Sequence, residues 1–208
     1  MTTALIIVDV QHDFLPGGSL AVPSGDAVIP VINRLIPIAG TVFATRDWHP
    51  ADHVSFAETH PGRVPGDTIT LDDGTPQILW PVHCVQNTHG GQLHPDLALP
   101  ANAMIVDKGT DPTVDSYSGF FDNGRRAATG LAERVAAVAP DRVLIAGLAT
   151  DYCVRATVID ACELGLPVTV VTDGCRAVDL AEGDGAQAID AMRAAGADIR
   201  TASEVLTA

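Results

Sequence analysis

The sequence predicts an α/β protein, built as a three-layer, open parallel β-sheet with helices on both faces. Short aliphatic runs alternate with segments of helical periodicity along most of the chain, which is the pattern of repeated strand–helix units. The first run, Ala4–Val10, is almost continuously apolar, as expected of a strand that is buried on both faces. A chain of 208 residues can bury a sizeable core, so we expect residues 1–208 to form one domain.

The remaining elements follow from the same alternation of patterns. Gly165 and Gly196 each follow a helical segment, at the place where a residue that tolerates a left-handed backbone commonly ends a helix. The expected helices cover Ala27–Ile36, Arg125–Val138, Asp151–Leu164 and Ala186–Ala195. The expected strands cover Ala4–Val10, Thr41–Thr45, Ala103–Val106, Arg142–Ala146, Val168–Val171 and Asp198–Thr201.

One long segment, from about residue 46 to residue 100, breaks this rhythm. It is rich in His, Pro, Gly and Asp and shows little periodicity. A loop segment of this length is usually functional or disordered. Both tryptophans of the chain and several histidines lie in it, which favours a functional segment.

Composition excludes several classes of partner. The chain has 12 Lys and Arg against 26 Asp and Glu, a formal net charge of −14, which argues against binding nucleic acid or an anionic membrane. The first residues lack the basic region and cleavage site of a signal peptide, and no apolar stretch is long enough to span a membrane. We therefore expect a cytoplasmic protein whose 4 cysteines, which lack a CxxC pattern, are free thiols.

Reactive side chains follow several of the predicted strands. Ligands of open α/β sheets bind beyond the carboxyl ends of the strands, and Asp9, Lys108 and Cys153 all stand there. Cys153 falls in the first turn of a predicted helix, where the helix dipole favours a thiolate. Asp9 is placed to act as general base, Lys108 to hold Asp9, and the backbone N–H groups of residues 149–153 to bind an oxyanion. This set predicts acyl transfer through a thioester.

Each of these residues also has a structural explanation when taken singly: a turn cap, a solvated amine, and a small buried side chain. Their convergence on one sheet edge favours catalysis. Cys84 is the remaining competitor for the role of nucleophile, because it lies in the long loop segment beside a candidate ligand. Cys162 and Cys175 are interpreted as structural.

A metal site is predicted from Asp47, His49 and His83, with His53 as a fourth member that ligates directly or through water. Asp47 and His49 are two residues apart and share one side of an extended chain. Zinc, iron and manganese accept such a mixture of nitrogen and oxygen ligands, and three protein ligands leave positions open. The alternative is that these are solvated loop histidines. No partner pattern involves the other histidines, which are His12, His60, His89 and His94.

These motifs resemble those of the bacterial nicotinamidases, a group within the isochorismatase-like cysteine hydrolase superfamily. The resemblance runs from about residue 4 to the C-terminus. Its most specific parts are Asp47-Trp48-His49 and Trp80-Pro81-Val82-His83, which isochorismatases and carbamoyl-amine hydrolases lack. The other matching segments are Ile7–Phe14, Pro16–Leu20, Ser55-Phe56, Lys108-Gly109, Ser116–Phe120 and Gly147–Val154.

The resemblance implies an isochorismatase-like hydrolase domain with a triad of Asp9, Lys108 and Cys153. It implies one divalent metal ion on Asp47, His49 and His83, with His53 or water in a fourth position, and no organic cofactor. It further implies a cis peptide before Ala149, so that the amides of Ala149 and Cys153 form the oxyanion hole. The aromatic residues Phe14, Trp80 and Tyr117 would line the ring pocket, although core packing is their alternative explanation.

The implied reaction is hydrolysis of nicotinamide to nicotinate and ammonia, a step of NAD salvage, with pyrazinamide as a second substrate and the metal holding the pyridine nitrogen. The segment of residues 64–77 varies in length within the family and leaves the size of the pocket open. Family members often self-associate, so a homo-oligomer is an open expectation.

The rival interpretations are another small-amide hydrolase and a non-catalytic metal-binding or ligand-binding protein. A nucleotide-binding Rossmann domain is disfavoured, because no GxGxxG follows the first strand.

Overall fold

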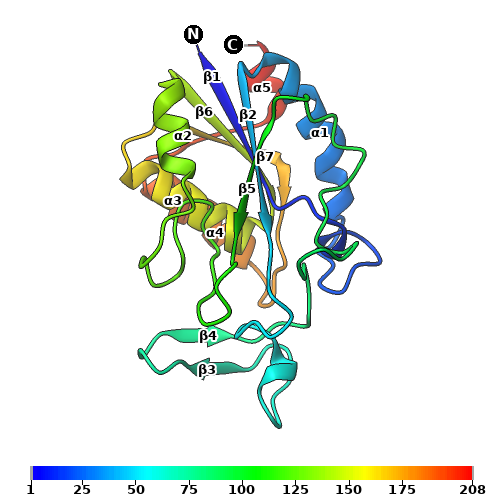
Figure 1. Cartoon of the computed structure of the whole chain (residues 1–208). Coiled ribbons are helices and arrows are strands. Elements are labelled where there is room, and N and C mark those ends of the chain that lie inside the picture. Colours follow the sequence, from blue (N-terminus) through cyan, green and yellow to red (C-terminus); the bar gives the residue numbers. More distant parts are fainter. Residues whose placement is uncertain (1, 208) are drawn as a thin grey trace.

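The computed structural model describes residues 2–207, and a parallel sheet forms its centre (Figure 1). Within these residues the sheet has six strands in the order β5-β2-β1-β6-β7-β8, and every neighbouring pair is parallel. The fold class predicted from the sequence is confirmed. The strands are β1 (Thr3–Val8), β2 (Thr41–Asp47), β5 (Met104–Lys108), β6 (Arg142–Leu148), β7 (Val168–Arg176) and β8 (Asp198–Arg200).

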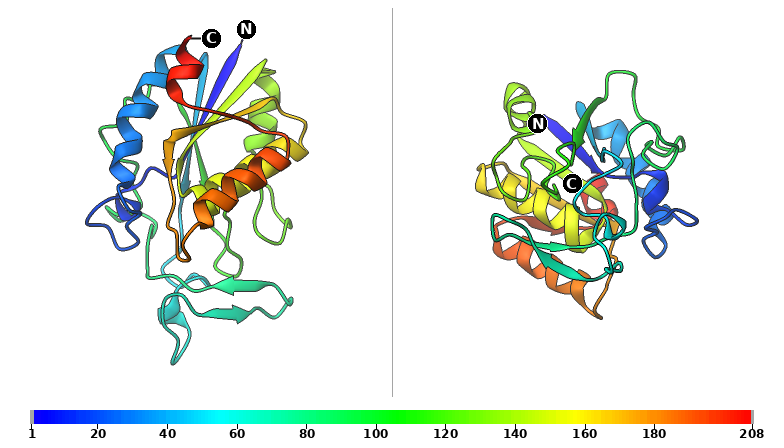
Figure 2. Two further views of the ribbon diagram at one scale, coloured as in Figure 1. Left: turned by 180° about the vertical axis from the view of Figure 1, so that it is seen from behind. Right: turned by 60° about the horizontal axis from the view of Figure 1, so that its bottom comes forward.

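Helices cover both faces of the sheet, as the alternating pattern predicts. Figure 2 shows α1 (Val28–Leu35) and α5 (Ala202–Thr207) on one face, with α3 (Arg155–Glu163) and α4 (Asp184–Ala194) on the other. The remaining helix, α2 (Leu131–Val138), lies on the same face as α3. Short 3-10 turns at Gly25–Ala27 and Ile36–Ile38 flank α1, others cover His12–Phe14 and Ala57–Thr59, and a π-helical turn, Thr150–Val154, precedes α3.

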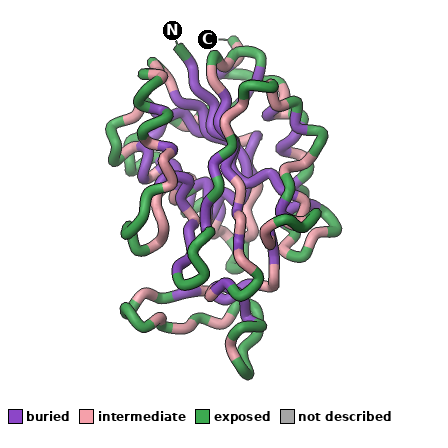
Figure 3. The backbone as a smooth tube through the Cα atoms, viewed as in Figure 1, coloured by how far each residue is buried: buried purple, intermediate pink, exposed green. Residues whose placement is uncertain are grey.

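Strand β1 lies at the centre of the core, and all of its residues are buried (Figure 3). Because helices cover both faces, its run of aliphatic side chains needs no polar alternation. Strand β6 approaches β1 so closely that a Cβ atom on Gly147 would lie 2.1 Å from the carbonyl oxygen of Val8. The chain continues from β1 toward β2 on one side and returns through β6 on the other. The space between the carboxyl ends of β1 and β6 is therefore the switch point where α/β sheets bind ligands.

Several predicted boundaries were wrong. The helix predicted for Arg125–Val138 begins only at Leu131, because the Asp122 carboxylate accepts the amides of Arg126 and Ala127 and holds them in a turn. Strands β2, β5, β6 and β7 extend further than predicted, so Asp47 and Lys108 end their strands and do not follow them. The first strand ends at Val8, before the predicted Val10. Helix α5 was not predicted.

The segment of residues 46–100 is ordered around an antiparallel hairpin, β3 (Thr68–Thr70) and β4 (Pro76–Ile78). The hairpin projects beyond the carboxyl ends of the sheet strands, at the bottom of Figure 1. Backbone hydrogen bonds from Trp80 to Ser55 and from Ala57 back to Trp80 tie the two sides of the segment together. Among residues 2–207, no helix is long and apolar enough to cross a membrane.

Candidate active site

The structure brings together Asp9, Lys108 and Cys153, the three side chains that the sequence predicts at the strand ends. The Lys108 Nζ atom lies 2.9 Å from Asp9 Oδ2 and 3.4 Å from Cys153 Sγ, and it donates to the Ser116 carbonyl at 2.8 Å. All three side chains are buried: Asp9 is 0% exposed, Lys108 1% and Cys153 6%. An ammonium group thus stands between a carboxylate and a thiol at the switch point of the sheet.

The backbone and a neighbouring hydroxyl fix the position of Asp9. Its φ of 49° is left-handed, so the chain turns sharply as soon as β1 ends. The Thr45 hydroxyl, on β2, donates to Asp9 Oδ1 at 2.6 Å, and the Asp9 amide donates to the Thr45 carbonyl at 3.3 Å. With Oδ1 occupied, Oδ2 is the oxygen that faces Lys108.

The electrostatics of this trio favour a neutral thiol beside a carboxylate base. Burial raises the pKa of Asp9 to about 6, although Lys108 opposes the shift. Burial also raises the pKa of the Cys153 thiol well above its usual range, again against the effect of Lys108. Burial lowers the pKa of Lys108, but the Asp47 and Asp9 carboxylates outweigh it and hold that pKa well above its ordinary value. The thiol therefore needs a base, which is the role that the sequence predicts for Asp9.

The predicted metal donors also lie together. Asp47, His49 and His83 are buried, and one ligand atom from each lies within 4.8 Å of the others. The Nδ1–H of His49 donates to the Gly109 carbonyl at 2.8 Å, and the Nδ1–H of His83 donates to the Pro81 carbonyl at 2.8 Å. These bonds fix the tautomers and leave both Nε2 lone pairs for a metal.

The charge state of this donor group suits a divalent cation. Burial lowers the pKa of His49 to about 3 and that of His83 to about 4, so both rings are neutral at physiological pH. Two neutral imidazoles and one carboxylate are ligands that zinc, iron and manganese accept. On its other side, Asp47 contacts the Lys108 ammonium, and the two residues are register partners on β2 and β5. The donor group therefore fits a metal, and Lys108 links it to the trio.

His53 lies beside this donor group without joining it. Its Nδ1 atom pairs with the Ser55 hydroxyl at 2.7 Å, and its Nε2 atom lies 3.3 Å from the Val114 carbonyl. The ring stacks near His49, with 4.0 Å between the ring centroids. His53 instead shares a different cluster with His49 and Asp115, in which the ligand atoms lie within 4.8 Å of one another.

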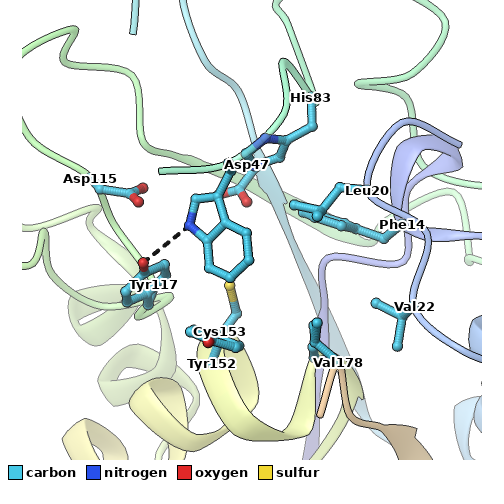
Figure 4. A pocket seen from close by; sticks show the side chains of 12 residues that line it. Phe14, Leu20, Val22, Asp47, His83, Asp115, Tyr117, Tyr152, Cys153 and Val178 are labelled. Carbon is cyan, nitrogen blue, oxygen red and sulfur yellow. Dashed lines mark hydrogen bonds between the residues drawn. The ribbon is translucent and has the colours of Figure 1, made fainter. Parts of the chain in front are cut away.

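A single pocket, of about 410 Å³ with its open mouth included, joins the thiol to the metal donors. Figure 4 shows Cys153 at one end, with Asp47 and His83 at the other. The indole N–H of Trp80 donates to the Tyr117 hydroxyl at 3.2 Å. The predicted pocket residues Phe14, Trp80 and Tyr117 line it, together with Leu20, Val22, Asp47, His83, Asp115, Ala149, Tyr152, Cys153 and Val178.

The pocket distinguishes Cys153 from its competitor Cys84. Cys84 is fully buried and does not line the pocket, whereas Cys153 does. Ala149 lies in the pocket wall, and the peptide between Leu148 and Ala149 is cis, as the resemblance implies. The pocket thus presents the Cys153 thiol next to the Ala149 backbone.

Comparison with known proteins identifies the family of this chain. Residues 3–204 match the isochorismatase domain family. The chain belongs to the isochorismatase family. Among curated members, the nicotinamidase of Escherichia coli is 50% identical over 205 residues, which cover 97% of this chain and 95% of that protein. The nicotinamidase/pyrazinamidase of Mycobacterium tuberculosis is 38% identical, covering 82% of this chain and 84% of that protein.

Solved structures of isochorismatase family members have the same fold over nearly their whole length. A nicotinamidase/pyrazinamidase of Acinetobacter baumannii superimposes with a TM-score of 0.93 at 42% identity, covering 98% of both chains. The yeast nicotinamidase bound to the inhibitor nicotinaldehyde gives 0.90 at 35% identity, covering 96% of this chain and 100% of that one. The pyrazinamidase of Pyrococcus horikoshii in complex with zinc gives 0.78 at 38% identity, covering 97% and 99%.

Sequence reasoning missed several residues of this isochorismatase family site. Asp115 is buried in the pocket wall, where its carboxylate accepts the Gln77 side-chain amide at 3.0 Å and the Ser116 backbone amide at 2.7 Å. No spacing pattern marks this residue, because Asp115 is one of several aspartates in its loop and only the fold brings it beside His49. The apolar wall was missed for the same reason, since Val178 comes from a segment far in the sequence from Leu20 and Val22.

Proposed function

We propose that the protein hydrolyses nicotinamide to nicotinate and ammonia through a thioester on Cys153. One observation carries the proposal: the Cys153 thiol, within 4.8 Å of its candidate base Asp9, lines a pocket that the metal donors Asp47 and His83 also line, in a chain 50% identical to a nicotinamidase. The family supplies the reaction class, and the donor group explains why a ring amide with a basic ring nitrogen suits this pocket.

In the first half-reaction, Asp9 takes the thiol proton as the sulfur of Cys153 attacks the amide carbon. The carbon–sulfur bond forms, and the carbonyl electron pair moves to oxygen, where the amides of Ala149 and Cys153 stabilise the charge. As the carbonyl re-forms, the carbon–nitrogen bond breaks. Asp9 returns the proton to the leaving nitrogen, which departs as ammonia and leaves a thioester.

In the second half-reaction, the Asp9 carboxylate removes a proton from water, and the resulting hydroxide attacks the thioester carbon. The carbon–sulfur bond breaks, the sulfur regains a proton from Asp9, and nicotinic acid leaves and loses its remaining proton to solvent to give nicotinate. Asp9 suits both directions of transfer because its pKa, raised to about 6 by burial, lies near neutral pH. Lys108 stays protonated throughout, holding Asp9 and stabilising negative charge on sulfur.

Asp47, His49 and His83 would hold one divalent ion, with zinc, iron and manganese as candidates, and His53 lies next to this group. Such an ion supplies a positive centre that binds the pyridine nitrogen and orients the ring. Phe14, Trp80 and Tyr117 would pack against the ring. Pyrazinamide, a ring amide of nearly the same shape, should fit the same space.

We further propose that residues 1–208 act as one isochorismatase-like domain in the cytoplasm, with a small molecule as substrate. The cysteines within the described residues are all free thiols, which suits a reducing compartment. The metal-bearing segment of residues 46–100 folds over the carboxyl ends of the sheet strands, so it completes the pocket of this domain. Self-association stays a prediction.

The test is ammonia release from a panel of amides, measured with and without a chelator. Nicotinamide and pyrazinamide should be turned over, the chelator should abolish or sharply weaken turnover, and added divalent metal should restore it. Turnover of a ureido or carbamoyl compound with none of nicotinamide would overturn the substrate assignment. Full activity in protein that elemental analysis shows to be metal-free would overturn the metal assignment.

A further inference from the structure

The π-helical turn Thr150–Val154, called the catalytic turn because it carries Cys153, contains a buried carboxylate, on Asp151, which the mechanism does not use. Asp151 is 3% exposed and precedes Cys153 by two residues. Its Oδ1 atom accepts the backbone amide of Val178 at 3.0 Å, and its Oδ2 atom accepts that of Asp179 at 2.8 Å. A single carboxylate therefore binds two successive amides of the segment that follows β7.

That segment, residues 177–183, has few other attachments. Among the described residues, no other acceptor bonds the amides of Val178 and Asp179, and the next side chain, Leu180, is 56% exposed. Its distal end is attached to α4, where the Asp179 carboxylate accepts the Gly185 amide at 2.8 Å and the Asp184 carboxylate accepts the Ala181 amide at 2.9 Å. The two bonds from Asp151 are thus what attaches this segment to the catalytic turn.

Val178 is the residue that this attachment places in the pocket. Its side chain lines the cavity beside Cys153, and Figure 4 shows it across the cavity from Tyr117 and Asp115. It belongs to the apolar side of the pocket, with Leu20 and Val22. A substrate ring that lies over the Cys153 thiol would therefore contact Val178 with the edge that faces away from Tyr117 and Asp115.

We propose that Asp151 is a positioning residue, which holds Val178 against the substrate ring by binding the amides of residues 178 and 179. This inference rests on the proposed amide hydrolysis and adds a determinant of substrate binding to it. Asp151 touches neither the triad nor the metal donors through these bonds. Its removal should therefore weaken binding of the ring and leave bond breaking at Cys153 largely intact.

The first test is Asp151→Asn, which keeps the shape and one acceptor oxygen but places an NH2 group against a backbone N–H. The KM for nicotinamide should rise about tenfold, as expected from the loss of one charge-assisted hydrogen bond, while kcat stays within about threefold. Asp190→Asn, an exposed carboxylate on α4, is the matched control and should change neither constant. A fall in kcat at unchanged KM would overturn the proposal, because it would place the role of Asp151 in the catalytic turn.

The second test asks whether Asp151 acts through Val178. Val178→Ala removes the side chain that the attachment positions, and it should also raise KM about tenfold. If the two residues act as one unit, the double variant Asp151→Asn/Val178→Ala should show a KM close to that of either single variant. Multiplied effects, near a hundredfold in KM, would contradict the proposal.

Hydrogen exchange measures the protection of the Val178 and Asp179 amides directly, and it does not depend on catalytic activity. In the wild-type protein the amides of Val178 and Asp179 should exchange slowly, and in Asp151→Asn they should exchange at least about tenfold faster, with β1 amides unchanged. Fast exchange of both amides in the wild type would overturn the attachment itself. An inactive wild type with protected amides would instead count against the proposed function alone.

Discussion

At the scale of single residues, Lys108 connects the two halves of the site. Its ammonium contacts Asp9, Asp47 and Cys153, so one charge serves the base, the nucleophile and a metal donor. The sequence predicts each of these residues, because carboxyl ends of parallel strands meet at one edge. It does not predict the contact between Lys108 and Asp47, which depends on the register of β2 against β5.

The raised pKa of Asp9 predicts the pH dependence of the reaction. Burial raises that pKa to about 6, and only the carboxylate form can take the thiol proton, so kcat/KM should fall as pH drops through about 6. Burial lowers the pKa of His49 to about 3 and that of His83 to about 4, so both histidines gain a proton only at pH values below the fall in kcat/KM that Asp9 causes. A pH–rate profile with nicotinamide checks this, and a profile that stays flat from neutral pH to pH 5 would contradict it.

Gly109 predicts a way to weaken the metal site without altering a ligand. A Cβ atom at Gly109 would lie 2.4 Å from Cε1 of His49, so Gly109→Ala should displace the ring. Metal affinity should fall about 10–100-fold, the range seen when groups that orient a ligand are disturbed. Metal content after dialysis against a buffered metal solution measures this.

Gly62→Ala is the matched control, because Gly62 has a similar positive φ but nothing within 4 Å of an added Cβ atom. It should bind metal like the wild type. Equal metal loss in both variants would mean that backbone strain, and not the contact with His49, is responsible.

At the scale of elements, the prediction of strands and helices from the sequence was most accurate where the element is completely buried. Residues 4–8 of β1 are all apolar, as expected of a strand covered on both faces, and this made β1 the easiest strand to predict. The β3–β4 hairpin was missed because its strands are short and largely exposed, although Asp73-Gly74 between them is a known hairpin signal. The helix predicted from Arg125 failed because the Asp122 side chain competes for the amides of the would-be first turn.

The contact between β1 and β6 predicts a large effect of a small substitution. Gly147→Ala would place a Cβ atom 2.1 Å from the Val8 carbonyl oxygen, and neither backbone can move aside in the centre of the sheet. The free energy of unfolding should fall by about 3 kcal/mol, the upper range for overpacking a core. Denaturant unfolding measures this quantity.

Gly165→Ala provides the comparison, since Gly165 also has a positive φ but open space around an added Cβ atom. Its loss should be only about 1–2 kcal/mol, the cost of a left-handed backbone. Equal losses in the two variants would refute the steric explanation.

At the scale of the whole molecule, the order of the strands makes the site. The sequence predicts a parallel sheet with two helical layers, but it does not tell which strands are neighbours, and the switch point between β1 and β6 emerges only from the fold. That arrangement brings Asp9 and Cys153 together from distant parts of the chain. The segment of residues 46–100 then supplies the metal donors and Trp80 to the same space.

Cys153 is the residue that breaks the amide bond of nicotinamide in the proposed reaction. The most direct test of this role measures the formation of nicotinate and ammonia by Cys153→Ala and by the wild type. Cys162→Ala, on α3, is the control because its thiol lies outside the pocket. Wild type and control should form nicotinate and ammonia at the same rate and in equal amounts, and folded, metal-loaded Cys153→Ala should turn over nicotinamide about a thousandfold or more slowly. Turnover by Cys153→Ala within about tenfold of the wild type would contradict this role.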